Sequence, residues 1–419
     1  MVSGARQVGK TFIIREFGRT CYESFIELNF IEDPQLKMIF EGSLRADDIL
    51  AAIRLYRRGA EIIDGQTLIF LDEIQECPEA FTAFKFLASD PRIHVVASGS
   101  ALGMIYNRMA SYPVGSVDYL DMFALDFEEF LWGLGVDASA VELLRGCFQR
   151  KEPVPAGIHE KMMHYLRQYM VIGGMPEVVS AFVSGEDYAA ADAVQRRIYR
   201  DYLADIARYA EPGIKIKAEN CYRSIPLQLS KENHKFQYSV VEKKATSRKF
   251  ESSVDWLVNA HMAAKICNVG FVEYPLQAHA ITNNFRLYPG DIGLLICTYD
   301  YGLKQALIAD GSADTSQHIV LKTAKGGLYE ALVADMLIKS GKENLFFYKN
   351  EQATVEIEFL LEGPKGIIPV EVKSGRAGTK SLDKLLQKED VCFGYKLSSQ
   401  NIGVAGDKIT LPLYMAMFL

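Results

Sequence analysis

Short apolar runs alternate with segments of helical periodicity along the first third of the chain. The runs at residues 24–30 (SFIELNF), 67–73 (TLIFLDE) and 92–100 (RIHVVASGS) are largely apolar on both faces, which is typical of buried strands. Between them, residues 47–58 (DDILAAIRLYRR) place apolar side chains at the spacing of one helix face. Because buried strands separated by helices form parallel sheets covered on both sides, this region is predicted to be α/β.

The periodicity then becomes helical, with little strand signal. Residues 160–179 (EKMMHYLRQYMVIGGMPEVV) and 193–211 (AVQRRIYRDYLADIARYAE) favour helices, and adjacent glycines and a proline break the first of them. Asp126 is expected to cap an earlier helix, with Glu129 reaching back to its backbone. Residues 250–266 (FESSVDWLVNAHMAAKI) predict a further amphipathic helix. We interpret this middle region as a helical or winged-helix-like unit.

Strand patterns return in the last third of the chain, which is predicted to be an α+β or α/β region. The predicted elements are a helix at 329–341 and strands at 345–350, 354–363 and 366–375. Together the patterns predict three domains, at residues 1–135, 136–278 and 279–419.

Composition and charge narrow the class of protein. The chain has 419 residues, of which 49% are hydrophobic and 24% charged, as expected for a globular protein of more than one domain. The net charge of −7 gives no overall attraction to nucleic acid, so such a contact would need a local basic surface. One candidate is the stretch 231–249, with a solvated helix face as the alternative. Its cations are Lys231, Lys235, Lys243, Lys244, Arg248 and Lys249.

The cysteines and the amino-terminal sequence indicate a compartment. The seven cysteines are scattered and show no C-x-x-C pair, which predicts reduced thiols. The sequence shows neither a signal peptide nor an apolar run long enough to span a membrane. We therefore expect a cytoplasmic protein without a membrane partner.

Residues 4–11 (GARQVGKT) match the phosphate-loop pattern G-x-x-x-x-G-K-[ST] without a mismatch. Consecutive backbone N–H groups and a helix N-terminus attract phosphate, and glycine lets the backbone approach closely. Lys10 would supply a full charge to the phosphates, and Thr11 would offer its hydroxyl to Mg²⁺. The residues predicted to bind the nucleotide are Gly4, Ala5, Arg6, Gln7, Val8, Gly9, Lys10 and Thr11.

A second motif supplies the acids that such a loop needs. The apolar run 68–73 (LIFLDE) ends in two acids: Asp72 is predicted to hold Mg²⁺ and Glu73 to orient the attacking water. The next run ends in ASGS, whose Ser98 and Ser100 would sense the terminal phosphate. A chance turn or an exposed strand end explains either motif alone. Their shared order and spacing predict an ATP or GTP site.

A separate set of charged residues lies in the last third of the chain. Glu330 opens a helix, Glu358 lies in a strand, and Glu371 and Lys373 share one face of the next strand. A hairpin at residues 363–366 would bring Glu358 beside them. Glu358 and Glu371 are candidate Mg²⁺ ligands, and all four residues are candidates for phosphodiester cleavage. The alternative is an inherited fold with a retained salt-bridge cluster.

The string of motifs GARQVGKT, LIFLDEIQE, VVASGSALG, YPVG, MFALDFEEFL and YMVIGGMPEVV resembles prokaryotic AAA-type ATPases, sometimes called archaeal ATPase-like. The likeness continues through YRDYLADIARY, FRLYPGDIGLL and IPVEVKSG. It implies a RecA-like sheet with adenine nucleotide as ligand, and a carboxyl-terminal domain similar to PD-(D/E)xK nucleases, which is a restriction-endonuclease-like α/β fold.

Two features depart from that family's pattern. Only residues 1–3 precede the loop, so the first strand is largely missing and nucleotide affinity is expected to be weakened. A truncated or mis-assigned start is the expected reason. Ser116 stands where relatives often carry a basic residue. Arg108 is then the candidate for an arginine acting on a neighbour's nucleotide, with a surface charge as the alternative.

Three functions stay open on the sequence. The leading hypothesis is an ATP-binding, Mg²⁺-dependent ATPase coupled to a nuclease-like domain that recognises or processes DNA or RNA. The second is a nucleotide-responsive regulatory protein that does not hydrolyse ATP and whose nuclease-like fold is inert. The third is a metal-dependent nuclease with a decayed ATPase half. Oligomer formation is compatible with all three.

Overall fold

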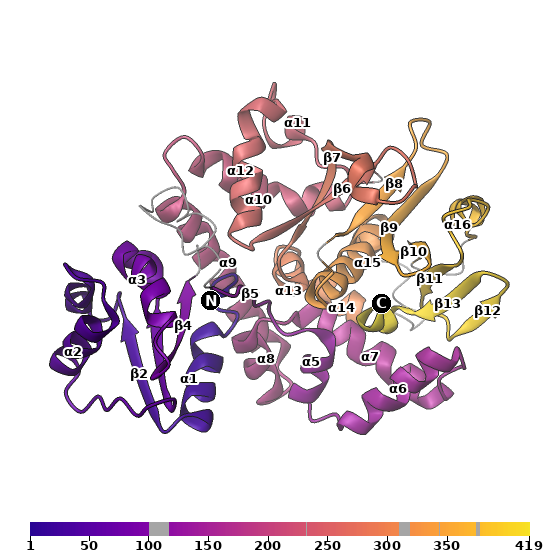
Figure 1. Cartoon of the computed structure of the whole chain (residues 1–419). Helices are drawn as coiled ribbons and strands as arrows, with labels where there is room; N and C mark the ends of the chain where they lie inside the picture. Colours follow the sequence, from indigo (N-terminus) through magenta and orange to yellow (C-terminus); the bar gives the residue numbers. More distant parts are fainter. Residues whose placement is uncertain (100–116, 232, 310–318, 343, 374–377) are drawn as a thin grey trace. The chain divides into compact units, whose positions relative to one another are not determined.

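The computed structural model describes residues 1–99, 117–231, 233–309, 319–342, 344–373 and 378–419 (Figure 1). Its contacts divide the chain into two compact units. The first unit comprises residues 1–123 and 259–261, and the second comprises 124–258 and 262–419. None of the described helices combines the length and apolar character that a membrane span requires.

The first unit is built on a five-stranded parallel sheet in the order β2-β3-β4-β1-β5 (Figure 1). Its strands are β1 (Val2–Ser3), β2 (Ser24–Asn29), β3 (Thr67–Asp72), β4 (Ile93–Gly99) and β5 (Leu120–Asp121). Its main helices are α1 (Lys10–Cys21), α2 (Ala46–Tyr56) and α3 (Pro78–Ala88). The parallel α/β prediction for this region is confirmed.

Apolar packing fixes the carboxyl ends of the strands at one edge of the sheet. Every residue of β3 is buried, as the continuous apolar run predicts for a central strand. Leu28, Ile53, Leu71 and Phe84 are fully or almost fully buried in one core between the sheet and its helices. The strand before the phosphate loop, β1, is two residues long and pairs with β4 and β5 on its two sides.

The second unit begins with helices that follow the predicted periodicity. These are α5 (Phe127–Gly133), α6 (Ala138–Arg150), α7 (Ala156–Ile172), α8 (Pro176–Val183), α9 (Tyr188–Tyr209), α10 (Lys215–Leu229), α11 (Tyr238–Val241) and α12 (Ser247–Asn259). Asp126 and Glu129 form the predicted capping box, with N···O distances of 2.8 and 2.9 Å. Gly173, in a positive-φ conformation, separates α7 from α8 where the sequence predicts a break.

An eight-stranded mixed sheet completes the second unit, in the order β12-β13-β11-β10-β9-β8-β6-β7. Its strands are β6 (Ala263–Val269), β7 (Ala280–Pro289), β8 (Phe346–Lys349), β9 (Glu356–Gly363), β10 (Gly366–Val372), β11 (Gly394–Ser398), β12 (Gly403–Ala405) and β13 (Lys408–Pro412). The accompanying helices are α13 (Ile292–Ile296), α14 (Tyr301–Ile308), α15 (Ile319–Lys339) and α16 (Lys380–Leu385). The predicted hairpin is present, with Gly363 opposite Gly366.

Two sequence predictions are wrong in this unit. Glu330 does not open a helix, because α15 begins at Ile319 and continues to Lys339. The helix expected at 250–266 ends at Asn259, and residues 263–269 form β6 instead. His261 has a φ of 55°, a left-handed conformation that cannot continue a helix, and pairing with β7 and β8 then decides the conformation of β6. The predicted boundary at residue 278 falls between β6 and β7, which are neighbours in one sheet.

Candidate functional site

The predicted phosphate loop connects β1 to α1 at the edge of the parallel sheet. Gly9 and Gln7 have φ values of 100° and 63°, so the loop turns sharply before α1 begins at Lys10. A Cβ atom on Gly4 would lie 2.1 Å from the Met122 carbonyl oxygen. This position therefore has no room for a side chain, which explains the glycine that opens the motif.

Lys10 points back into its own loop. Its ammonium donates hydrogen bonds to the carbonyl oxygens of Gly4 and Ala5, at 2.9 and 2.6 Å, and the residue is 8% exposed. Burial lowers the pKa of Lys10 to about 8, against the opposing charges of Glu73 and Asp72. A buried ammonium held by carbonyl oxygens retains much of its positive charge for an incoming anion, because neutral acceptors do not cancel it.

Asp72 lies at the end of β3 and accepts hydrogen bonds from several elements. The Thr11 hydroxyl is 3.2 and 3.3 Å from its two carboxylate oxygens, the Asn29 amide is at 3.0 Å, and the Ser98 hydroxyl also donates to it. Burial raises the pKa of Asp72, while the Ser98 and Thr11 hydroxyls oppose the shift. The structure therefore brings together the loop and the first acid of the second motif.

The other predicted residues are placed around this pair. Glu73 follows Asp72 in a left-handed conformation (φ 54°), and its carboxylate accepts a hydrogen bond from Gln75. Ser98 is buried and engaged with Asp72, so its hydroxyl is not directed to solvent. Ala5 and Val8 are buried in the loop, and Arg6 and Gln7 are more exposed. The predicted residues Ser100, Arg108 and Ser116 lie outside the described residues.

Asn29 is the residue of this site that the motifs did not identify. It pairs with Asp72 in register across β2 and β3, and its side chain also accepts from the backbone N–H groups of Ile31 and Glu32. A signal was present, because the predicted strand 24–30 carries a polar residue near its carboxyl end. Polar residues at that end of parallel strands converge on one edge of the sheet.

The lowered pKa of Lys10 predicts a pH dependence of phosphate binding. Below a pH of about 8 the ammonium is already charged, and above it the bound phosphates must restore the proton. We therefore expect the Kd for a fluorescent ATP analogue to be flat from pH 6.5 to 7.5. Above pH 8 it should rise by up to about tenfold per pH unit. A Lys10→Arg variant, which stays charged, should lose this rise. A flat wild-type profile to pH 9.5 would contradict the assignment.

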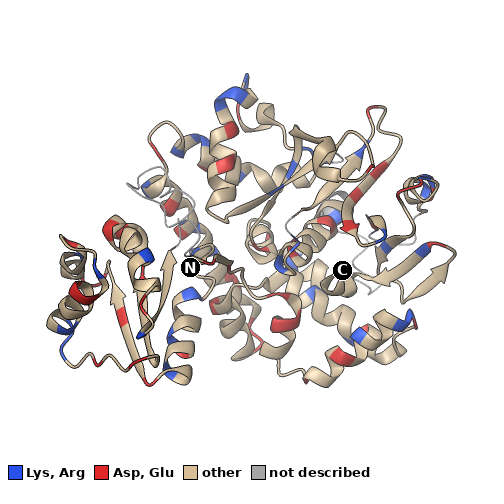
Figure 2. Ribbon diagram, in the orientation of Figure 1, with Lys and Arg blue, Asp and Glu red and all other residues tan. Residues whose placement is uncertain are grey.

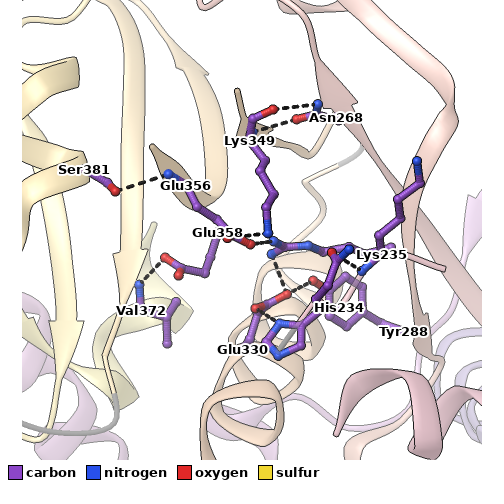
Figure 3. Close-up of polar contacts among 12 residues, drawn as sticks. His234, Lys235, Asn268, Tyr288, Glu330, Lys349, Glu356, Glu358, Val372 and Ser381 are labelled. Carbon is purple, nitrogen blue, oxygen red and sulfur yellow. Dashed lines mark hydrogen bonds and ion pairs between the residues drawn. The ribbon is translucent and has the colours of Figure 1, made fainter. Parts of the chain in front are cut away.

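A second polar cluster occupies the sheet of the second unit (Figure 3). Glu330 of α15 accepts a hydrogen bond from Arg286 at 2.7 Å, lies 2.6 Å from His234 Nδ1, and accepts a further bond from the Tyr288 hydroxyl. Arg286 and Glu330 are almost completely buried. Burial alone would raise the pKa of Glu330, but the charges of Arg286 and His234 lower it to about 2.

The neighbouring carboxylates have cationic partners of their own. Glu356 pairs with Arg286 and, at 2.8 Å, with Lys349. Lys373 lies 3.0 Å from Glu371 and 3.8 Å from Glu358. The Val372 N–H donates to Glu358 at 2.9 Å (Figure 3). Burial raises the pKa of Glu358 to about 7, although the charge of Lys373 opposes this.

The structure thus divides the four residues predicted for phosphodiester cleavage into two groups. Glu358, Glu371 and Lys373 lie together, whereas Glu330 makes its contacts with Arg286, His234 and Tyr288. Among the described residues, no group of three or more His, Cys, Asp or Glu side chains could hold a metal ion. Sequence reasoning missed Arg286, whose signal was a single charge inside the apolar segment FRLYP.

Comparison with protein families finds matches to three parts of the chain. Residues 1–131 match a family model described as an AAA domain. The amino-terminal region is similar to AAA-type ATPases. The matched region contains the loop, Asp72 and Asn29, and its likeness to an AAA domain supports nucleotide binding. Residues 163–305 and 325–411 match two families described as domains of unknown function (DUF8612 and DUF4143).

Solved structures give more distant likenesses. The Walker-type ATPase PABY2304 of Pyrococcus abyssi is 11% identical, with 71% of this chain and 90% of that chain covered and a TM-score of 0.41. The ORC2 protein of Aeropyrum pernix, solved in ADPNP and ADP complexes, is 14% identical, with 74% of this chain and 88% of that chain covered and a TM-score of 0.33. Cdc6p of Pyrobaculum aerophilum is 12% identical, with 74% of this chain and 87% of that chain covered and a TM-score of 0.25. No curated protein sequence matches the chain.

Proposed function

We propose that this protein is an ATP-binding, Mg²⁺-dependent ATPase whose second unit recognises nucleic acid without cutting it. The convergence of Lys10, Thr11 and Asp72 carries the first half of the proposal. A buried cation, a hydroxyl and a carboxylate meet where a helix begins and a parallel strand ends. Such an arrangement suits a triphosphate with its metal ion.

The residues present fit a magnesium ion. Mg²⁺ prefers oxygen ligands, and the Thr11 hydroxyl and the Asp72 carboxylate are 3.2 Å apart. These two residues would hold the ion, directly and through water, and the ion would neutralise charge on the phosphate oxygens when bound. Ser98 and Asn29 orient the Asp72 carboxylate, because each donates a hydrogen bond to it.

Lys10 and Glu73 have separate roles in binding the phosphates and orienting the attacking water. Lys10 would exchange its loop carbonyls for phosphate oxygens, because an ion pair with phosphate is stronger than a hydrogen bond to a neutral carbonyl. Glu73 would accept a hydrogen bond from the attacking water and orient it, and its half-buried position beside Asp72 suits that role. Ser100, outside the described residues, stays a candidate sensor of the terminal phosphate.

The ion pairs of the second unit support recognition in preference to cleavage. Glu330, Glu356, Glu358 and Glu371 each pair with a cation of the protein. A metal ion at Glu358 and Glu371 would have to compete with the Lys373 ammonium, which already lies beside both. We therefore propose that this nuclease-like cluster stabilises the fold and that the second unit contacts nucleic acid elsewhere.

Phosphate release from ATP by the purified full chain tests the proposed function. We expect steady turnover in the presence of Mg²⁺ and none after chelation with EDTA, because the uncompensated phosphate charge would then oppose water attack. Linear and circular DNA and a structured RNA, incubated with Mg²⁺ or Mn²⁺, should stay intact. Tight ATP binding without turnover would favour a regulatory protein, and cleavage that requires Lys373 would favour a nuclease.

A further inference from the structure

We propose that duplex nucleic acid binds by its phosphates, without regard to sequence, to a basic surface in the second unit. The basic surface lies at the starts of α10 and α12 and in the turn that precedes α12 (Figure 2). It consists of Lys215, Lys217, Lys243, Lys244, Arg248 and Lys249. The proposal deepens the proposed recognition of nucleic acid and does not depend on ATP turnover.

The cations of this surface are not neutralised by the protein. Lys243, Lys244, Arg248 and Lys249 are exposed, and the segment 243–250 contains no acid. Within the part of the chain that the structure describes, no ion pair involves any residue of the basic surface. Other arginines of the same helical region do pair, as Arg196 does with Asp192 at 2.8 Å and Arg223 with Glu219 at 2.9 Å. Glu242 and Glu251 flank the surface and leave it an excess of positive charge.

The positions of these cations are unfavourable for folding. Neither α10 nor α12 has an acidic residue in its first turn. Lys215 and Lys217 stand in the first turn of α10, and Arg248 and Lys249 stand in that of α12. The amino end of a helix carries partial positive charge, so a cation there destabilises the helix by about 0.3–1 kcal/mol. A surface that keeps such cations without carboxylate partners indicates a requirement other than folding, and an anionic ligand meets it.

The helices that carry the basic surface are held together by packing beneath it. The Ser253 hydroxyl of α12 donates to the Ile214 carbonyl, which precedes α10, at 3.4 Å. The Lys217 ammonium lies 5.8 Å from the centroid of the Phe250 ring, and that ring is 6.0 Å from the ring of Tyr238 in α11. These contacts join the starts of α10 and α12 to α11, which leads into the turn, so the cations are spaced along one packed surface that suits a ligand with several spaced charges.

The chemistry of the surface favours a duplex over other polyanions. Single strands bind by stacking their bases on exposed aromatic rings, and Phe250 is buried while Tyr238 is half-buried. A membrane surface would add apolar insertion, but Ile216, at 69% exposed, is the single large exposed apolar side chain among residues 215–217 and 238–259. Lysine ammonium groups contact phosphates without reading bases, so no sequence preference is expected.

Fluorescence anisotropy with a labelled 30-base-pair DNA of random sequence tests the proposal on the full chain. The wild type should bind, with log Kd rising against log salt at a slope of about 4, as expected for four or five neutralised phosphates. The quadruple variant K243E/K244E/R248E/K249E should bind at least roughly tenfold more weakly and lose most of that slope. Its thermal midpoint should be unchanged or higher, because acids now stand in the first turn of α12.

The matched control reverses the charge at four exposed lysines elsewhere in the second unit, in the variant K342E/K365E/K384E/K388E. It makes the same change in net charge and should leave DNA affinity within roughly threefold of wild type. Equal losses in both variants, tighter binding of a single strand, or binding of phosphatidylserine vesicles but not of duplex would each overturn the proposal. Lys10→Ala should bind the duplex normally, which separates this result from failure of the ATPase.

Discussion

Replacing Lys10 with alanine is expected to remove ATP binding and turnover together, whereas replacing Glu73 with glutamine should stop turnover and preserve binding. Lys10 is the buried cation of the loop, and its charge-assisted contact with phosphate contributes about 3 kcal/mol. The Kd for ATP should therefore rise roughly a hundredfold or more in Lys10→Ala. Glutamine at position 73 keeps the size of the side chain but cannot accept the proton of the attacking water. Turnover should fall by roughly 10² to 10³.

Two exposed residues of α3 provide matched controls for these variants. Lys85→Ala and Glu79→Gln make the same chemical changes on the same unit, away from the loop, and should retain wild-type binding and turnover. Calorimetry gives the Kd and phosphate release gives the rate, so the two roles are measured separately. Wild-type turnover in Glu73→Gln would assign the orientation of water to another residue. Weak binding in Glu73→Gln would mean that Glu73 shapes the pocket.

The amino-terminal site could be predicted from the sequence because its residues lie in short consecutive motifs. The loop is eight consecutive residues, and Asp72 and Glu73 end a run of apolar residues that is typical of a buried strand. Parallel strands bring their carboxyl ends to one edge, so two short motifs suffice to predict a site without any knowledge of long-range contacts. The motifs did not identify Asn29, because its role depends on its pairing with Asp72 across the sheet and on no motif.

The second unit was less readable because its contacts join residues far apart in the chain. Arg286 pairs with Glu330, 44 residues away in the sequence, and with Glu356, 70 residues away, and no local sequence pattern predicts either pairing. The strand β6 was predicted as a helix because its sequence is compatible with both structures. Pairing with β7 and β8 selects the strand, and such tertiary selection is invisible to local periodicity.

The charged groups of the two units have different kinds of partner. In the first unit Lys10 is held by neutral carbonyls and Asp72 by neutral hydroxyls and an amide, so both charges stay available for a ligand. In the second unit Arg286 is shared between Glu330 and Glu356, and the charges cancel within the protein. A binding site needs charges that are held by neutral groups, as in the first unit. Charges that are paired with opposite charges, as in the second unit, are expected of groups that stabilise the fold.

Replacing Arg286 with methionine should therefore destabilise the second unit strongly. The change removes the guanidinium but keeps a long side chain, and it leaves the carboxylate of Glu330 buried with one fewer partner. Breaking a buried pair in this way costs about 3–5 kcal/mol. In a thermal melt we expect the transition of this unit to fall by about 10 °C. Arg223→Met, which removes a largely exposed pair with Glu219, should change the midpoint little.

The pH dependence and a double variant identify Glu330 as the source of that loss. In the wild type the pKa of Glu330 is about 2, below its ordinary value, so its stabilisation is present at neutral pH and is lost only in strong acid. Without Arg286 burial dominates and the pKa rises, so the carboxyl is neutral at low pH and its charge opposes folding as the pH increases. The destabilisation should therefore be larger at pH 8 than at pH 5. Adding Glu330→Gln should recover part of the midpoint, since the uncompensated charge is then gone. Recovery by millimolar Mg²⁺ in Arg286→Met, but not in the double variant, would instead mean that the guanidinium occupies a metal position between Glu330 and Glu356.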